Sequence, residues 1–296
     1  MILPPMILPV SFFALTWPPD SLSCLIRAVR VIRGSVFRLL FSGVPVDVER
    51  HNHEQIEMLN QRGGRTLSIV DLVGAGTISV AMAAYAMRAM ERGASVLTAA
   101  RPGAAGKTTL MATLLGFLPP GVRIVTVDSP RAIADGLARP ANEPLCYLAH
   151  EIGSGHWFGY IWGRDVADFL SLMDGPRRIA SCLHADTLDE LTDILCSPPL
   201  HVPRELLGRV GLILFMHVAP GHRRRVAAFH EADGQGGHRL LFEWDRKIDS
   251  FRQTGESADA VELRPYRDFV QRLVEEGDVE VEAVRGKVVE FYRGER

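Results

Sequence analysis

Apolar residues form two kinds of segment after residue 65, and their alternation predicts an α/β protein. Short, nearly continuous apolar runs are typical of buried strands, whereas apolar residues spaced three and four positions apart are typical of helices with one buried face. The runs of strand length cover residues 95–100, 122–127, 143–149 and 178–183. The helical patterns cover residues 78–92, 108–118, 166–173 and 266–276. Because strands and helices alternate, we expect a mostly parallel sheet flanked by helices.

The first 48 residues differ from the rest of the chain, and we expect them to form an N-terminal extension without ordered structure. Residues 1–17 are apolar, but prolines interrupt them, so no run is long enough for a transmembrane helix. A signal peptide is not expected, because no charged residue precedes Asp20. The alternative is that residues 25–40, which carry four arginines among apolar residues, form a basic amphipathic helix on an anionic membrane surface.

Composition narrows the class of protein. The chain of 296 residues has a formal net charge of −2, which argues against a strongly basic DNA-coating protein and against an acidic disordered tail. Arginine supplies nearly all of the positive charge, since the lysines are Lys107, Lys247 and Lys287. The four cysteines have no spacing typical of a zinc site, and we expect free thiols.

The strand run 95–100 is followed by the residues RPGAAGKTT at positions 101–109, and these by a helical pattern. Small residues let consecutive backbone N–H groups converge on phosphate oxygens, and the helix N-terminus adds partial positive charge. Lys107 would contact the β and γ phosphates of a nucleotide, and the Thr108 hydroxyl would bind Mg²⁺. The alternative is an ordinary strand-to-helix turn, because Arg101 stands where the motif G-x-x-x-x-G-K-[ST] has its first glycine. The predicted nucleotide-binding residues are Pro102, Gly103, Ala104, Ala105, Gly106, Lys107, Thr108 and Thr109.

Two acidic residues follow the next strand runs. Asp128 comes directly after residues 122–127, and Glu151 comes shortly after residues 143–149. Ligands of parallel sheets bind at the carboxyl ends of the strands, so we expect both acids near the loop. Glu151 suits the orientation or deprotonation of an attacking water, and Asp128 suits the binding of Mg²⁺ or an assisting role. For each acid taken alone, the alternative is a solvated loop residue.

The run 178–183 ends next to His184, which we expect at the same edge of the sheet, close to the γ-phosphate. The alternative is a histidine with a structural role. Asp186 is predicted to cap the helix that follows, with Asp189 in the position of a capping box.

Four aromatic residues lie in the Gly-rich stretch between Glu151 and His184. They either cover the edge of the sheet or form a contact patch for a partner or a neighbouring subunit. They are Trp157, Phe158, Tyr160 and Trp162.

These motifs, in this order, resemble those of the type II/IV secretion and type IV pilus ATPase superfamily, which includes archaeal flagellar motor ATPases. PGAAGKTT is similar to its phosphate-binding loop, RIVTVDSP to its acidic box, YLAHEIG to its Walker B strand and SCLHADTLDEL to its histidine box. The stretch that ends in GHRRRV is similar to the strand and Arg-rich turn after that box. The five segments are residues 102–109, 123–130, 147–153, 181–191 and 206–226.

The resemblance implies an ATPase with a RecA-like core, which uses ATP and Mg²⁺ and has Glu151, Asp128 and His184 as catalytic residues. It also implies a homo-oligomeric ring, usually a hexamer, at the cytoplasmic face of a membrane secretion or pilus machine. An arginine from a neighbouring subunit would then neutralise charge in the transition state, with Arg123, Arg131 and 223–225 as candidates. The corresponding division of the chain is an extension (1–48), a helical lead-in (49–94), the P-loop ATPase core (95–245) and a small C-terminal element (246–296).

Two other functions remain open at this point. Arg101, Asp128 and His150 depart from the family pattern, since His150 stands where an acidic residue usually precedes the catalytic glutamate. They favour a regulatory subunit that binds nucleotide without hydrolysing it. The other alternative is a P-loop enzyme stimulated by nucleic acid, against which the near-neutral charge argues.

Overall fold

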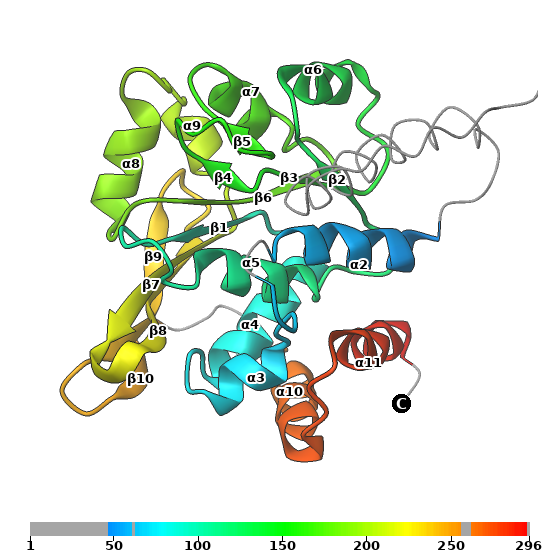
Figure 1. The fold of residues 1–296 in the computed structure, drawn as a ribbon, viewed down its shortest axis with the longest axis vertical. Coiled ribbons are helices and arrows are strands. Elements are labelled where there is room, and N and C mark those ends of the chain that lie inside the picture. Colours follow the sequence, from blue (N-terminus) through cyan, green and yellow to red (C-terminus); the bar gives the residue numbers. More distant parts are fainter. Residues whose placement is uncertain (1–46, 61–62, 256–261, 295–296) are drawn as a thin grey trace, which may run out of the picture. The chain divides into compact units, whose positions relative to one another are not determined.

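The computed structural model describes residues 47–60, 63–255 and 262–294. In these ranges one mixed sheet forms the centre of the molecule (Figure 1). Its main path runs β10-β9-β8-β7-β1-β6-β3-β2, while β4 pairs with β6 and β5 pairs with β4. The strands are β1 (Val96–Ala99), β2 (Arg123–Thr126), β3 (Leu145–Leu148), β4 (Glu151–Ile152), β5 (Tyr160–Ile161), β6 (Arg178–Leu183), β7 (Leu212–Ala219), β8 (Arg223–Ala232), β9 (His238–Asp245) and β10 (Ser250–Gln253).

The order of the strands separates a parallel part from an antiparallel part. Strands β2, β3, β6, β1 and β7 run parallel, and β1 pairs with β6 on one side and with β7 on the other. Strands β8, β9 and β10 continue the sheet in antiparallel order. A strand inserted between β1 and β3 is typical of RecA-like cores. The predicted fold class is therefore confirmed, and the sheet extends to Gln253, past residue 245.

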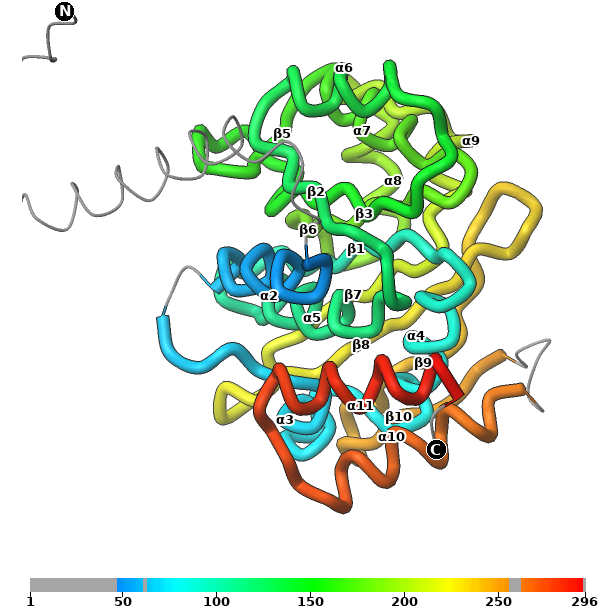
Figure 2. The backbone as a smooth tube through the Cα atoms, turned by 90° about the vertical axis from the view of Figure 1, so that its right-hand side faces the viewer, coloured from blue at the N-terminus to red at the C-terminus, as the bar shows by residue number. Residues whose placement is uncertain are grey.

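Helices cover both faces of the sheet (Figures 1 and 2). The two faces bury separate apolar clusters, so the architecture has three layers. The helices on one face are α2 (Val48–Met58), α3 (Ile69–Gly74), α4 (Val80–Glu91), α5 (Lys107–Leu115), α10 (Arg264–Glu276) and α11 (Val281–Arg293). Those on the other are α6 (Pro130–Ala138), α7 (Asp165–Ser171), α8 (Leu188–Cys196) and the short α9 (Arg204–Leu207).

Helix α2 protects the outer edge of the sheet at β2. The side-chain amide of Asn52 donates to the carbonyl of Val122 at 2.7 Å and accepts from the N–H of Ile124 at 2.8 Å. His51 Nε2 lies 2.8 Å from the carbonyl oxygen of Ile124. An exposed strand edge offers unpaired N–H and C=O groups to other chains, and these side chains satisfy some of them.

The C-terminal helices pack on the core rather than apart from it. The predicted helix over residues 266–276 is α10, and the tail after it forms helix α11. Arg285 on α11 pairs with Glu49 on α2 at 2.8 Å, which ties the last helix to the first described one. The hydroxyl of Tyr292 lies 2.8 Å from the carbonyl oxygen of Phe117.

Some sequence predictions fall on residues that are not described. The N-terminal extension, apart from Asp47 and Val48, and the amphipathic helix considered over residues 25–40 lie outside the described residues. Within the described part of the chain, no helix combines the length and apolar character needed to cross a membrane. Of the four cysteines predicted to be free thiols, Cys146, Cys182 and Cys196 are free, and Cys24 lies outside the described residues.

Candidate functional site

The predicted phosphate-binding loop joins the carboxyl end of β1 to the first turn of α5. Gly106 is the N-cap of α5 with φ +97°, a conformation that favours glycine because it has no Cβ. Ala104 also lies in the left-handed region, with φ +61°. Pro102 and Gly103 are exposed, whereas Ala105 is buried. The unpaired N–H groups of the first helical turn therefore face an exposed loop of small residues, which suits the binding of an anion.

Lys107 is the first residue of α5, and 6% of its surface is exposed. Its Nζ lies 3.4 Å from Nε2 and 3.5 Å from Nδ1 of His184. The Thr98 hydroxyl on β1 donates to the Lys107 carbonyl at 3.0 Å and so links the strand to the helix start. Thr108 is half-buried, whereas Thr109 is exposed. The ammonium group is therefore held at the carboxyl end of the sheet.

Glu151 and His184 meet at the same place. Glu151 Oε1 lies 3.2 Å from His184 Nε2, and the side chains are 13% and 45% exposed, respectively. His184 Nδ1 lies 2.7 Å from the carbonyl oxygen of Arg101. A carbonyl can only accept, so Nδ1 carries a proton. Nε2 then accepts from the ammonium of Lys107, or, when the ring is protonated, donates to Glu151.

Asp128 is not brought to this cluster. It follows β2, and β3 and β6 lie between β2 and the loop strand β1. Neighbouring strands lie about 4.8 Å apart, which puts the ends of β2 and β1 about 14 Å apart. The Asp128 carboxylate accepts a hydrogen bond from Ser129 at 3.0 Å and is exposed.

Arg101, in place of the usual glycine, is tied to the start of α8. Its N–H donates to Asp186 at 2.7 Å, and its guanidinium pairs with Glu190. The prediction that Asp186 caps α8 is wrong: Thr187 is the N-cap and accepts from the N–H of Glu190 at 3.2 Å. Glu190, rather than Asp189, accepts the Asp186 N–H, at 2.9 Å. The Asp186 carboxylate instead accepts a hydrogen bond from the backbone N–H of Arg101 in the phosphate-binding loop.

His150 points away from the loop. Its ring packs edge to face on Phe158 at 5.3 Å, and a Cβ on Gly159 would lie 2.6 Å from His150 Cγ. Within the described residues neither ring nitrogen has a hydrogen-bond partner, and burial lowers the pKa of His150 to about 4. The position before Glu151 therefore supplies no ligand to the loop.

An open cleft of about 520 Å³ begins beside Glu151 and His184. Tyr160 lines it, and burial together with the nearby Glu151 raises the pKa of the Tyr160 hydroxyl to about 12. Trp157 and Trp162 line it too, and Trp157 is 69% exposed. Three of the four aromatic residues predicted either to cover the sheet edge or to form a contact patch thus line a cleft at the site, whereas Phe158 packs on His150.

A nucleotide with Mg²⁺ fits the donor groups present. In the described residues no three His, Cys, Asp or Glu side chains are grouped to hold a metal ion by themselves. The Thr108 hydroxyl and the Glu151 carboxylate both lie near the buried Cys182 thiol, 3.8 Å and 3.9 Å from its sulfur. Mg²⁺ in nucleotide sites is bound by few protein oxygens together with phosphates and water. This donor set therefore suits Mg²⁺ that arrives with a nucleotide.

One contact to the loop was not predicted from the sequence. Arg224, at the start of β8, donates to the carbonyl of Ala104, whereas the sequence had suggested the arginine cluster only as a source of a transition-state arginine. Cys182 likewise lies between Thr108 and Glu151, which follows from its pairing with Thr98 across β6 and β1. Both residues lie in segments that resemble family motifs, GHRRRV and SCLHADTLDEL, but the motifs did not single them out. Strand register is the signal that would have found Cys182.

The fold and the strand–loop–helix unit at its centre define an α/β protein with a RecA-like core. No protein-family model matches the chain, and no curated protein matches it. Among solved structures, the VirB11 ATPase from the Brucella suis type IV secretion system, in complex with sulphate, is similar over 75% of this chain at 16% identity and a TM-score of 0.37. The Legionella pneumophila ATPase DotB is similar over 70% at 11% identity and a TM-score of 0.35.

The matched regions span 66% of the VirB11 chain and 59% of the DotB chain. At these identities and TM-scores the likeness adds nothing to what the side chains of the site establish.

Proposed function

We propose that this protein binds ATP with Mg²⁺ at residues 102–109 and hydrolyses it. The observation that supports the proposal most strongly is the convergence of Lys107, His184 and Glu151 at the start of α5. Three separate segments supply these side chains: Lys107 begins α5, Glu151 begins β4, and His184 directly follows β6. A positive charge, a proton-carrying ring and a carboxylate at one helix N-terminus suit phosphoryl transfer to water.

Each residue has a role that follows from its position. The N–H groups of the loop and of the first turn of α5 would hold the phosphates, and Lys107 would exchange its contact with His184 for one with the terminal phosphates. Thr108 would hold Mg²⁺, which neutralises developing charge on the phosphates. Glu151 would orient the attacking water and accept its proton, since its carboxylate opens toward the cleft. His184 would contact the terminal phosphate, and its contact with Glu151 would make the position of that carboxylate depend on the bound nucleotide.

ATP binding by Lys107→Ala tests the proposal directly. We expect the dissociation constant for ATP to rise about 100-fold, because the variant loses the ammonium that contacts the phosphates. Lys247→Ala is the control, since Lys247 lies exposed in the turn between β9 and β10. Isothermal titration in the presence of Mg²⁺ measures both. If the wild-type protein does not bind ATP, the proposal is wrong.

A regulatory subunit that binds ATP without hydrolysing it is the second candidate. It is favoured by the positions of Asp128 and His150, which leave Glu151 as the acid beside Lys107. Phosphate release in the wild-type protein separates the two functions. Tight ATP binding without turnover would support the regulatory subunit. A third candidate, an enzyme stimulated by nucleic acid, requires turnover to rise when DNA or RNA is added.

We also propose that the protein works as a ring-forming motor subunit of a secretion or pilus-like machine at the cytoplasmic face of a membrane. The cleft beside Glu151 and His184 supports a site shared between subunits, because it leaves room for a side chain of a neighbour. Particle mass with and without ATP and Mg²⁺ tests it. We expect a hexamer with nucleotide, and a monomer under both conditions would contradict a ring.

A further inference from the structure

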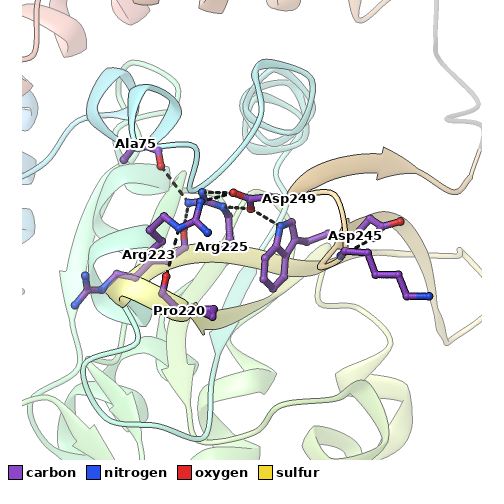
Figure 3. A network of polar contacts seen from close by, with 9 residues as sticks. Ala75, Pro220, Arg223, Arg225, Asp245 and Asp249 are labelled. Atoms are coloured by element: carbon purple, nitrogen blue, oxygen red, sulfur yellow. Dashed lines mark hydrogen bonds and ion pairs between the residues drawn. The ribbon is translucent and has the colours of Figure 1, made fainter.

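Three consecutive arginines at the start of β8 make two different sets of contacts. Figure 3 shows the set made by Arg223 and Arg225 around Asp249. Successive side chains of a strand point to opposite faces, so Arg224 lies on the face opposite Arg223 and Arg225. Arg225 is buried, and its guanidinium donates to both carboxylate oxygens of Asp249 at 2.9 and 3.1 Å and to the carbonyl of Ala75 at 3.1 Å. Arg223 donates to the same carboxylate.

Asp249 joins this pair of arginines to the turn between β9 and β10. The Trp244 indole N–H also donates to it, at 2.9 Å. Hydrogen bonds from Arg225 and then from Trp244 hold the pKa of Asp249 well below its usual range. The carboxylate therefore stays charged and fixes the position of the first residues of β8.

Arg224 reaches the phosphate-binding loop instead. Its Nε and Nη2 each lie 3.2 Å from the carbonyl oxygen of Ala104, and its Nη1 donates to His222 at 3.3 Å. The stem of Arg224 also packs on the loop, because a Cβ on Gly106 would lie 3.2 Å from Arg224 Cδ. The same Cβ would lie 3.3 Å from Cε of Met216, on the neighbouring strand β7.

The residue that Arg224 contacts has an unfavourable backbone conformation. Ala104 has φ +61°, which a residue with a Cβ adopts less readily than glycine. In a planar trans peptide the C=O and the following N–H point in opposite directions. When Arg224 holds the carbonyl of Ala104, the N–H of Ala105 is therefore directed away from Arg224.

We propose that Arg224 is a positioning residue that keeps the nucleotide-free phosphate-binding loop in the conformation that accepts a nucleoside triphosphate, and that Asp249 keeps Arg224 in place. The inference rests on the proposed ATP site and extends it to a residue outside the phosphate-binding loop. It couples Asp249, between β9 and β10, to the affinity for nucleotide.

Arg224→Ala tests the role of the guanidinium. We expect the dissociation constant for ATP to rise about 10-fold, and the amides of residues 101–107 to exchange hydrogen faster in the nucleotide-free protein, at an unchanged melting temperature. Arg264→Ala is the control, because Arg264 is an exposed arginine at the start of α10 that pairs with Asp268 on the same helix. Equal ATP affinity in the two variants would overturn the proposal. An absence of ATP binding in the wild-type protein would instead overturn the proposed function.

A second pair of variants separates positioning from direct contact with the ligand. Glycine adopts the Ala104 conformation without help, so the loss from Arg224→Ala should shrink to about threefold in an Ala104→Gly background. An undiminished 10-fold loss would show that Arg224 acts on the nucleotide itself and would overturn the positioning role. Asp249→Asn should weaken ATP binding about threefold, and unchanged affinity in this folded variant would overturn the role of Asp249.

Discussion

Strands β3 and β2 are each followed by an acidic residue, and the fates of the two acids differ. Glu151, after β3, lies 3.2 Å from His184 and within a short chain of contacts to Lys107. Asp128, after β2, lies at the edge of the parallel part of the sheet and bonds to its own neighbour, Ser129. In the sequence both acids follow an apolar run of strand length, so the runs alone do not distinguish them. The number of strands between each acid and the loop therefore decides which acid can act on a bound phosphate.

The largest expected effect is that of Glu151→Gln on turnover. The variant keeps the shape of the side chain but cannot accept a proton, so we expect the rate of phosphate release to fall at least about 100-fold. ATP affinity should stay within about threefold of wild type, because Lys107 and the loop are unchanged. Steady-state phosphate release and isothermal titration measure the two quantities. A rate of phosphate release close to wild type would contradict the role of Glu151 as the acid that acts on the attacking water.

The next largest effect concerns His150, the buried residue directly before Glu151. Its pKa is about 4 in the folded protein and 6.5 in the unfolded chain, so between these values the unfolded state binds more protons. The free energy of unfolding should therefore fall by about 2 kcal/mol from pH 7 to pH 5 on account of this group. Urea denaturation at both pH values measures it. In His150→Leu the pH dependence should be weaker by this amount, and an unaltered slope would contradict the assignment.

His184→Gln should have a smaller effect on turnover than Glu151→Gln. The variant loses the ring that lies between Lys107 and Glu151, but it keeps the general base, so we expect a decrease of about 10-fold in the turnover number. His156→Gln is the control, because His156 is exposed in the loop after β4. If both variants lose activity equally, His184 has no special role at the site.

The smallest effect should come from Asp128→Asn. The isolated protein should keep ATP turnover within about twofold of wild type, since the carboxylate is about three strand spacings from the loop. Asp128→Glu should behave in the same way, which would show that the length of this side chain does not limit the rate. A 100-fold loss in Asp128→Asn would mean that a rearrangement or a neighbouring subunit brings this acid to the nucleotide.

The sequence predicted the elements that carry the site more reliably than the contacts between them. The strand runs and the loop between β1 and α5 follow from local periodicity and small residues, so Lys107 could be placed from local pattern alone. The meeting of Glu151 and His184 followed from the rule that parallel strands share a carboxyl edge. That rule does not give the order of strands, which is why Asp128 was expected at the loop.

Other features depend on contacts that no local pattern reveals. Aspartate is a common N-cap residue, but the Asp186 carboxylate accepts a hydrogen bond from the N–H of Arg101 instead, and Arg101 is far away in the sequence. Arg224 is one of three adjacent arginines. It lies on the opposite face of β8 from the other two, because successive side chains of a strand point to opposite faces. His150 is directed into a buried position by Gly159, which leaves space for its ring.

The walls of the cleft next to Glu151 have a practical consequence. Trp157 and Trp162 are indoles in a partly solvated setting within the group of residues that includes Glu151 and His184. Indole fluorescence responds to the polarity around the ring, so the protein carries its own optical reporters at the site. Closure of the cleft by a ligand or a neighbouring copy would shift their emission toward shorter wavelengths, and no attached dye is needed to follow it.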